Sequence, residues 1–128
     1  YENALSYIDR VQPDLLVLSW PSMVWSPLQE WGRGTAIKRY QLMKARRSQR
    51  KLLRFVRDAA INQRRRGGAL LGENPEPSRA WKEPLVIEAF DNAGDMKTDM
   101  CRFGFKVPGH TQPLMKKRTR LRGTPQVL

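Results

Sequence analysis

Polar side chains that could do chemistry follow two apolar runs of strand length. Ser22 comes shortly after the run 15–18, and Glu73 and Asn74 follow the run 69–71 after a single glycine. In open α/β sheets, reactive groups gather at the carboxyl ends of the strands. A hydroxyl, a carboxylate and an amide are therefore expected to lie near one another, with Ser22 as a potential nucleophile and Glu73 as a potential ligand-binding group.

The elements that must position these groups follow from apolar spacing, proline and glycine. We expect helices at 4–11, 35–66 and 78–90 (the last interrupted at Pro84), and strands at 15–18, 69–71, 97–105 and 114–122. This order predicts one α/β domain over residues 1–128, with a partial doubly wound, Rossmann-like sheet of parallel strands and a C-terminal antiparallel hairpin. The run 15–18 is apolar throughout, which is typical of a strand covered on both faces. The inner face of the long helix is expected to comprise Leu42, Ala45, Gln49, Leu52, Val56, Ala59 and Gln63, and to be widened by Leu53, Phe55 and Ala60.

The two strand-end segments resemble motifs of the cytosine-C5 DNA methyltransferase family, in its catalytic half. That family has Pro-Pro-Cys-x-x-aromatic-Ser after one strand and Glu-Asn-Val after the next; here the segments are WPSMVWS (20–26) and ENP (73–75). A third family motif, Gln-x-Arg-x-Arg, is similar to the segment at 116–120, where Arg118 and Arg120 have the spacing of the two arginines and Lys116 replaces the glutamine. The resemblance extends over residues 12–124 and is stronger to divergent, retroelement-associated domains. It implies a methyltransferase-like half-domain.

The resemblance also implies what this chain lacks. In the family, a cysteine thiolate attacks C6 of cytosine and a carboxyl group holds the base near N3, but this chain has Ser22 in place of the cysteine. A lone serine is a far weaker nucleophile and needs a partnered base. The S-adenosylmethionine site of the family would lie upstream, so no cofactor is expected here unless such a half exists. Ser22, Glu73, Asn74 and Arg120 are accordingly degenerate catalytic positions, and the chain is expected to be inactive as it stands; the alternative is a fragment of an active methyltransferase.

The strongest global signal is charge, because 24 Lys and Arg face 12 Asp and Glu, a net charge of +12. A balance of this kind favours a polyanionic partner, with nucleic acid (DNA or RNA) ahead of a membrane surface. Twelve of the cations lie between residues 38 and 66, where Asp58 is the single acidic residue. With so few acidic partners in this segment, we expect phosphates to neutralise the run. The predicted nucleic-acid contacts are Arg46, Arg47, Arg50, Arg54 and Arg57 on the basic helix, Lys116, Lys117, Arg118 and Arg122 on the basic strand, and Trp25 as a stacking ring.

Several alternatives stay open at this point. The charge could merely keep the domain soluble, or it could belong to a structural protein of a larger RNA-containing assembly; an upstream protein segment is another possible partner. Trp20, Trp25 and Trp31 could stack on bases or pack against the sheet, whereas Trp81 is expected in the core. One cysteine and one histidine argue against a disulfide within the chain and against a metal site, and fit a reducing, intracellular compartment, nuclear or organellar. No apolar run approaches the roughly 20 residues of a membrane span, so no membrane partner is expected.

Overall fold

The computed structural model describes residues 2–31, 34–99 and 118–128. Within these ranges the chain forms, in order, α1 (Glu2–Val11), β1 (Leu15–Ser19), the 3-10 helices η1 (Met23–Trp25) and η2 (Pro27–Glu30), α2 (Ala36–Arg65), β2 (Ala69–Pro75), the 3-10 helix η3 (Arg79–Lys82), α3 (Pro84–Ala89), β3 (Gly94–Asp99) and β4 (Arg118–Gly123). The expected helices and strands are all present, as far as the described residues extend. The strand segments at 100–105 and 114–117 lie outside the described residues.

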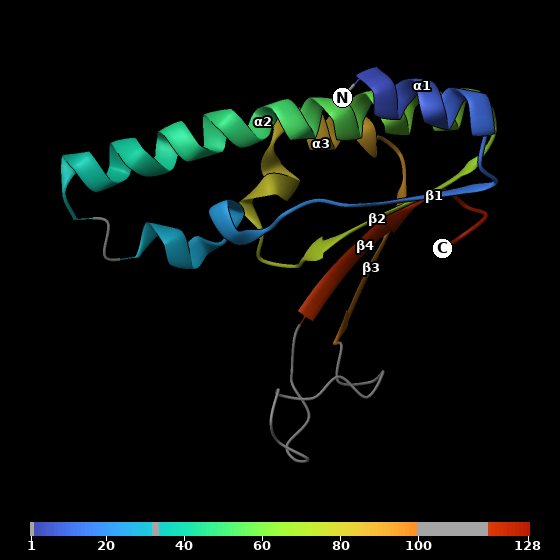
Figure 1. The fold of residues 1–128 in the computed structure, drawn as a ribbon. Helices are drawn as coiled ribbons and strands as arrows, with labels where there is room; N and C mark the ends of the chain where they lie inside the picture. The colour runs from blue at the N-terminus through green and yellow to red at the C-terminus, as the bar shows by residue number, and fades with distance from the viewer. Residues whose placement is uncertain (1, 32–33, 100–117) are drawn as a thin grey trace, which may run out of the picture.

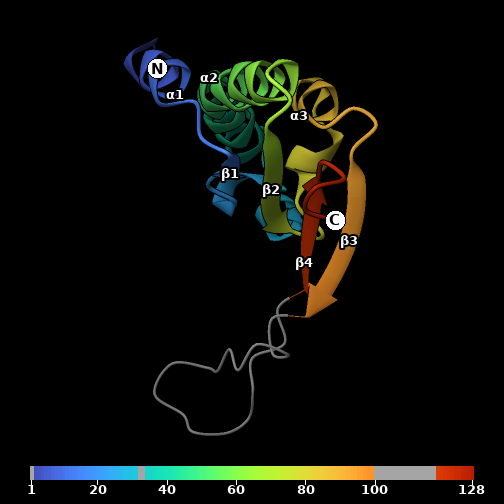
Figure 2. The same ribbon diagram turned by 90° about the vertical axis from the view of Figure 1, so that its right-hand side faces the viewer.

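The four strands form one mixed sheet in the order β1-β2-β4-β3 (Figures 1 and 2). β1 and β2 are parallel, with Leu15 opposite Ala69, and α2 makes the crossover between them. β4 runs antiparallel to both of its neighbours, β2 and β3. A mixed α/β fold with a parallel pair and an antiparallel C-terminal part is therefore confirmed.

Several boundaries differ from the sequence prediction: α1 begins at Glu2 and not at residue 4, β3 begins at Gly94 and not at residue 97, and two further differences concern the site and the segment after it. β2 continues through Pro75, so Glu73 and Asn74 lie within the strand and not in a loop after it. The reason is that β2 has a partner on each side, and the pairing with β4 extends to Pro75 opposite Thr119. The segment 78–90 divides at Pro84 into η3 and α3, because proline cannot supply the backbone N–H that a continuous helix requires.

α2 has clear signals at both ends. The Thr35 hydroxyl accepts a hydrogen bond from the Lys38 N–H at its start, and Gly67, with φ +76°, follows its end. The helix buries Leu42, Leu53, Val56, Ala59, Ala60 and Gln63. Leu52, expected on the inner face, is instead exposed, because the buried stripe is centred on Leu53 and Val56. The small side chains of Ala59 and Ala60 are fully buried, which lets α2 pack closely.

Three aromatic rings fill the space between helices and sheet. Trp20 lies with its ring centroid 5.2 Å from that of Trp81 and 6.1 Å from that of Phe90. Trp81 and Trp20 are both buried, so the expectation that Trp81 belongs to the core is confirmed. Gly72 of β2 faces the Phe90 ring so closely that a methyl group at this position would overlap it.

The three helices gather on one side of the sheet (Figure 1). The alternate residues of β1 point to its other side, where Leu15 is 47% and Val17 54% exposed, and Met96 of β3 is also exposed. The expectation that strand 15–18 is covered on both faces is wrong for the described chain. The run is apolar on both faces, but the described helices cover only one.

The close approach of Gly72 to Phe90 generates a test of the core. Gly72→Ala should destabilise the fold by about 1–3 kcal/mol, because the ring has to move in a packed interior. The free energy of unfolding is measured by urea titration followed by circular dichroism. Gly34→Ala is the matched control, since a methyl group there meets no atom within 4 Å; equal effects of the two changes would contradict the packing described.

Candidate nucleic-acid interface

The carboxyl ends of β1 and β2 bring together a hydroxyl and a carboxylate. Ser19 lies opposite Glu73 in the parallel pairing, and its Oγ donates a hydrogen bond of 2.8 Å to Glu73 Oε2. Glu73 is half-exposed, as a ligand-facing carboxylate would need to be. The sequence analysis did not include Ser19 among the site residues. Its position at the end of the strand that precedes Ser22 could have indicated it.

Ser22 lies nearby in the chain, at the start of η1, and is half-buried. Its carbonyl accepts a hydrogen bond from the Trp25 N–H, but its side chain makes no capping bond. Within the described ranges no histidine, carboxylate or amine forms a hydrogen bond with the Ser22 hydroxyl. The geometry therefore gives this serine no base that could activate it.

Asn74 and Arg120, the two other degenerate catalytic positions, form hydrogen bonds that connect neighbouring elements of the fold. Asn74 is 1% exposed and its Nδ2 donates to the Trp20 carbonyl at 2.7 Å, which ties the end of β1 to β2. Arg120 lies opposite Asn74 on β4 and makes two hydrogen bonds of 2.8 Å to the Asp95 carboxylate. Its guanidinium also covers the Trp81 ring, 5.2 Å from the centroid. The Arg120 hydrogen bonds hold the pKa of Asp95 below its usual range.

Trp25 does not have the role predicted for it. The side chain is 1% exposed and lies beneath the guanidinium groups of Arg46 and Arg50, at 5.6 and 5.7 Å from the ring centroid. A ring in this position cannot stack on a base, so the prediction of Trp25 as a nucleic-acid contact is wrong. Trp20 is also buried, whereas Trp31 is 73% exposed.

Three of the five predicted arginines of α2 have partners inside the molecule. Arg46 donates to the Val24 carbonyl (2.8 Å) and to Glu30 (3.2 Å), and Arg50 donates to Glu83 (2.6 Å). Arg57 donates to Asp58 (3.0 Å) and lies 3.8 Å from Glu88. The segment 38–66 itself holds one carboxylate, that of Asp58, but η2, the residue before α3 and α3 itself each bring another to the helix, so part of the run is neutralised within the molecule.

A second set of cations on α2 stays on the surface. Lys44, Arg47, Lys51 and Arg54 are exposed, and none forms a hydrogen bond or an ion pair with another residue in the described part of the chain. Their spacing of three, four and three residues places them on one face of the helix. We call these four residues the cationic row. Arg47 and Arg54 were predicted as contacts; the two lysines were missed, although the spacing was visible in the sequence.

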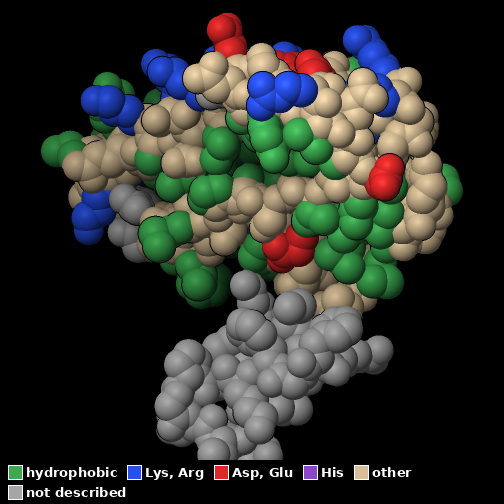
Figure 3. All heavy atoms as spheres, turned by 45° about the vertical axis from the view of Figure 1, so that its right-hand side comes forward, with side chains coloured by type: hydrophobic (Ala, Val, Ile, Leu, Met, Phe, Trp, Pro, Cys, Tyr) green, Lys and Arg blue, Asp and Glu red, His purple; other side chains and the backbone are tan. Residues whose placement is uncertain are grey.

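The predicted second basic strip is only partly at the surface. Arg118 is exposed and lies 3.8 Å from Asp99, whereas Arg122 is half-buried and donates to the Ala93 carbonyl at 3.1 Å. Lys116 and Lys117 lie outside the described residues. In Figure 3, Lys and Arg side chains line the helical side of the molecule, and hydrophobic side chains gather over the sheet below them.

Two further classes of site are not found in the described ranges. No group of three or more His, Cys, Asp or Glu side chains there could hold a metal ion. No described helix combines the length and the apolar character needed to cross a membrane.

Comparisons of the chain with protein-family models, with curated proteins and with solved structures find no match.

The Asp95–Arg120 pair predicts a dependence of stability on pH. Because folding lowers the pKa of this carboxyl, its contribution is present above the unfolded pKa and is lost as the pH falls through the folded value. Below about pH 4, the free energy of unfolding should therefore fall more steeply in the wild type than in Asp95→Asn. Urea titrations from pH 6 to pH 3 measure this, with Asp91→Asn, which removes an exposed carboxylate, as the control. Parallel curves for the wild type and Asp95→Asn would count against the pair.

Proposed function

We propose that this chain is a nucleic-acid-binding, methyltransferase-like half-domain that is catalytically inactive as it stands. The observation that carries the proposal is the cationic row, four exposed cations on one face of α2 with no acidic partner among the described residues. At 1.5 Å per residue, the row extends for about 15 Å along the helix. Several backbone phosphates of a nucleic acid can lie along such a length.

The contrast within α2 supports binding over a purely solubilising charge. Arg46, Arg50 and Arg57 are each compensated by a carboxylate, so the fold does bring acidic groups to this helix where they stabilise it. The cationic row lacks such compensation, and its like charges repel one another. A phosphate backbone would relieve this repulsion and release its own condensed counterions.

The mode of binding follows from the type of contact. Lysine and arginine side chains on an exposed helix face meet phosphate oxygens, which carry no sequence information. The proposal therefore predicts binding with little dependence on sequence and with a strong dependence on salt.

We test the row by changing its four cations to glutamine in one variant, Lys44→Gln, Arg47→Gln, Lys51→Gln and Arg54→Gln. The affinity for a fluorescent oligonucleotide, measured by anisotropy at about 0.1 M salt, should fall roughly ten- to hundredfold. The slope of log affinity against log salt should decrease in magnitude by about 3, since about 0.7 counterion is released per phosphate contact on a single strand.

A control variant separates the row from net charge. Changing Arg10, Arg65, Lys82 and Lys97 to glutamine also removes four cations, but from exposed positions outside the cationic row and outside the predicted contacts. This control should retain most of the affinity and of the salt slope. Equal losses in both variants, each with unchanged circular dichroism, would mean that the row is not the binding site.

A fragment of an active cytosine methyltransferase is the second candidate, and one observation favours it. The half-exposed Glu73 lies at the carboxyl end of β2, beside the strand that leads to Ser22, which is the arrangement that the resemblance requires. S-adenosylmethionine would then bind to an upstream half, if one exists, and a complete doubly wound sheet would include further strands from that half.

Ser22→Cys tests this second candidate in the chain as it is. A thiolate at this position could add to C6 of a bound cytosine, so that C5 takes a solvent proton, loses its original hydrogen and releases the thiolate. The expected result is release of label from cytosine tritiated at C5, with none from the wild type, whose hydroxyl has no base. Ser26→Cys is the control, and no release from Ser22→Cys, under conditions where the oligonucleotide binds, would contradict the candidate.

A further inference from the structure

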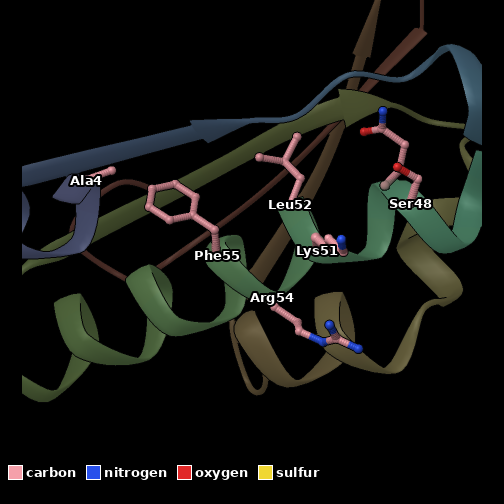
Figure 4. A pocket seen from close by; sticks show the side chains of 7 residues that line it. Ala4, Ser48, Lys51, Leu52, Arg54 and Phe55 are labelled. Carbon is pink, nitrogen blue, oxygen red and sulfur yellow. The ribbon is translucent and has the colours of Figure 1, made fainter. Parts of the chain in front are cut away.

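A groove runs between α1 and α2, directly beside the cationic row. Ala4 of α1 lines one side, and two turns of α2 between Ser48 and Phe55 line the other. The side chains of Leu52 and Phe55 form its apolar part (Figure 4), and Lys51 and Arg54 of the cationic row are among its lining residues, with the Arg54 guanidinium directed away from Leu52 and Phe55. The groove has a volume of about 730 Å³, within the range of small-molecule sites.

The polar groups of the groove lie together at one end. Ser48 and Gln49 are one turn from Leu52 along α2, and Figure 4 shows Ser48 on the same side of the helix as Leu52. Neither side chain makes a hydrogen bond within the described ranges, so a hydroxyl and an amide are available to a ligand. An amide offers both donors and an acceptor, as the edge of a nucleobase does.

We infer that this groove takes one unpaired base of a single-stranded nucleic acid whose phosphates lie on the cationic row. The inference rests on the proposed function and adds the class of nucleic acid. A nucleotide joins a flat, weakly polar ring to an anion, and the groove places an apolar surface with two hydrogen-bonding groups directly beside two cations. In a duplex the bases are stacked and paired, so only an unpaired base can enter.

This site is separate from the strand ends. Its lining residues all come from α1 and α2, whereas Ser22 and Glu73 lie at the ends of β1 and β2. Binding in the groove therefore requires neither the missing cysteine nor a cofactor.

The test fills the groove without changing charge. Ala4 is exposed on α1, and Ala4→Phe would place a ring in the groove; Asn3→Phe adds the same ring at the neighbouring exposed position, which does not line the groove. The probes are a single strand carrying 2-aminopurine and a duplex of the same length. The wild type should bind the single strand roughly tenfold more tightly than the duplex, as one stacked base allows, and should change the 2-aminopurine fluorescence. Ala4→Phe should lose both effects and keep its duplex affinity, while Asn3→Phe should keep both.

The outcomes distinguish the inference from the proposed function. Equal binding of single strand and duplex by the wild type, or an unchanged preference in Ala4→Phe, would overturn the groove site and leave the cationic row in place. The groove site would also be overturned if an acidic peptide displaces the single strand and if binding of the strand leaves the 2-aminopurine fluorescence unchanged. If the wild type binds neither the single strand nor the duplex, the proposed function itself is contradicted.

A second variant covers the possibility that Ala4→Phe disturbs packing. Gln49→Ala removes the amide at the polar end of the groove, and Gln41→Ala, on an exposed position of the same helix, is its control. Gln49→Ala should reduce the preference for the single strand several-fold and leave duplex affinity unchanged. No difference between these two variants would count against the groove.

Discussion

The packing of α2 on the sheet is the constraint on which the other features depend. Leu53, Val56, Ala59 and Ala60 are buried against the aromatic cluster of Trp20, Trp81 and Phe90. Once this stripe is fixed, the rotation of the helix is fixed, because side chains repeat every 3.6 residues. The cationic row then has to face solvent. The direction in which the row faces is thus a consequence of the core, and changes that rotate α2 would turn the row away from solvent.

Some cations of α2 are paired with carboxylates in the described part of the molecule, and those of the cationic row are not. The arginines on the flanks of the buried stripe meet Glu30, Glu83 and Glu88, which come from segments far along the chain. These contacts neutralise charge where the helix approaches other elements, and two of the arginines also cover the buried Trp25 ring. The four cations of the cationic row meet no such group in the described chain. A helix with a large net charge can therefore be stable and still leave charge available to a ligand.

Much of this fold was predictable from local pattern, since Thr35 and Gly67 mark the ends of α2 and Pro84 divides the segment after β2. The side-chain environment was not, because it depends on residues distant in sequence. Nothing near Trp25 indicates that two arginines of α2 will cover it, and nothing near Arg50 indicates Glu83. The same holds for Glu73, whose place inside β2 follows from pairing with β4. The cationic row was partly predicted, because helical spacing is a local property that tertiary contacts do not change.

The position of β1 at the edge of the sheet has a consequence for how copies of the chain behave together. The outer side of β1 pairs with no strand in the described part of the chain, and an edge of this kind with exposed Leu15 and Val17 is a template for pairing with another chain. In solution a net charge of +12 keeps such copies apart. A polyanion bound as proposed would neutralise that charge, and the β1 edges of copies on one strand could then meet. The charge proposed to attract a nucleic acid is thus also the charge that opposes contact between β1 edges.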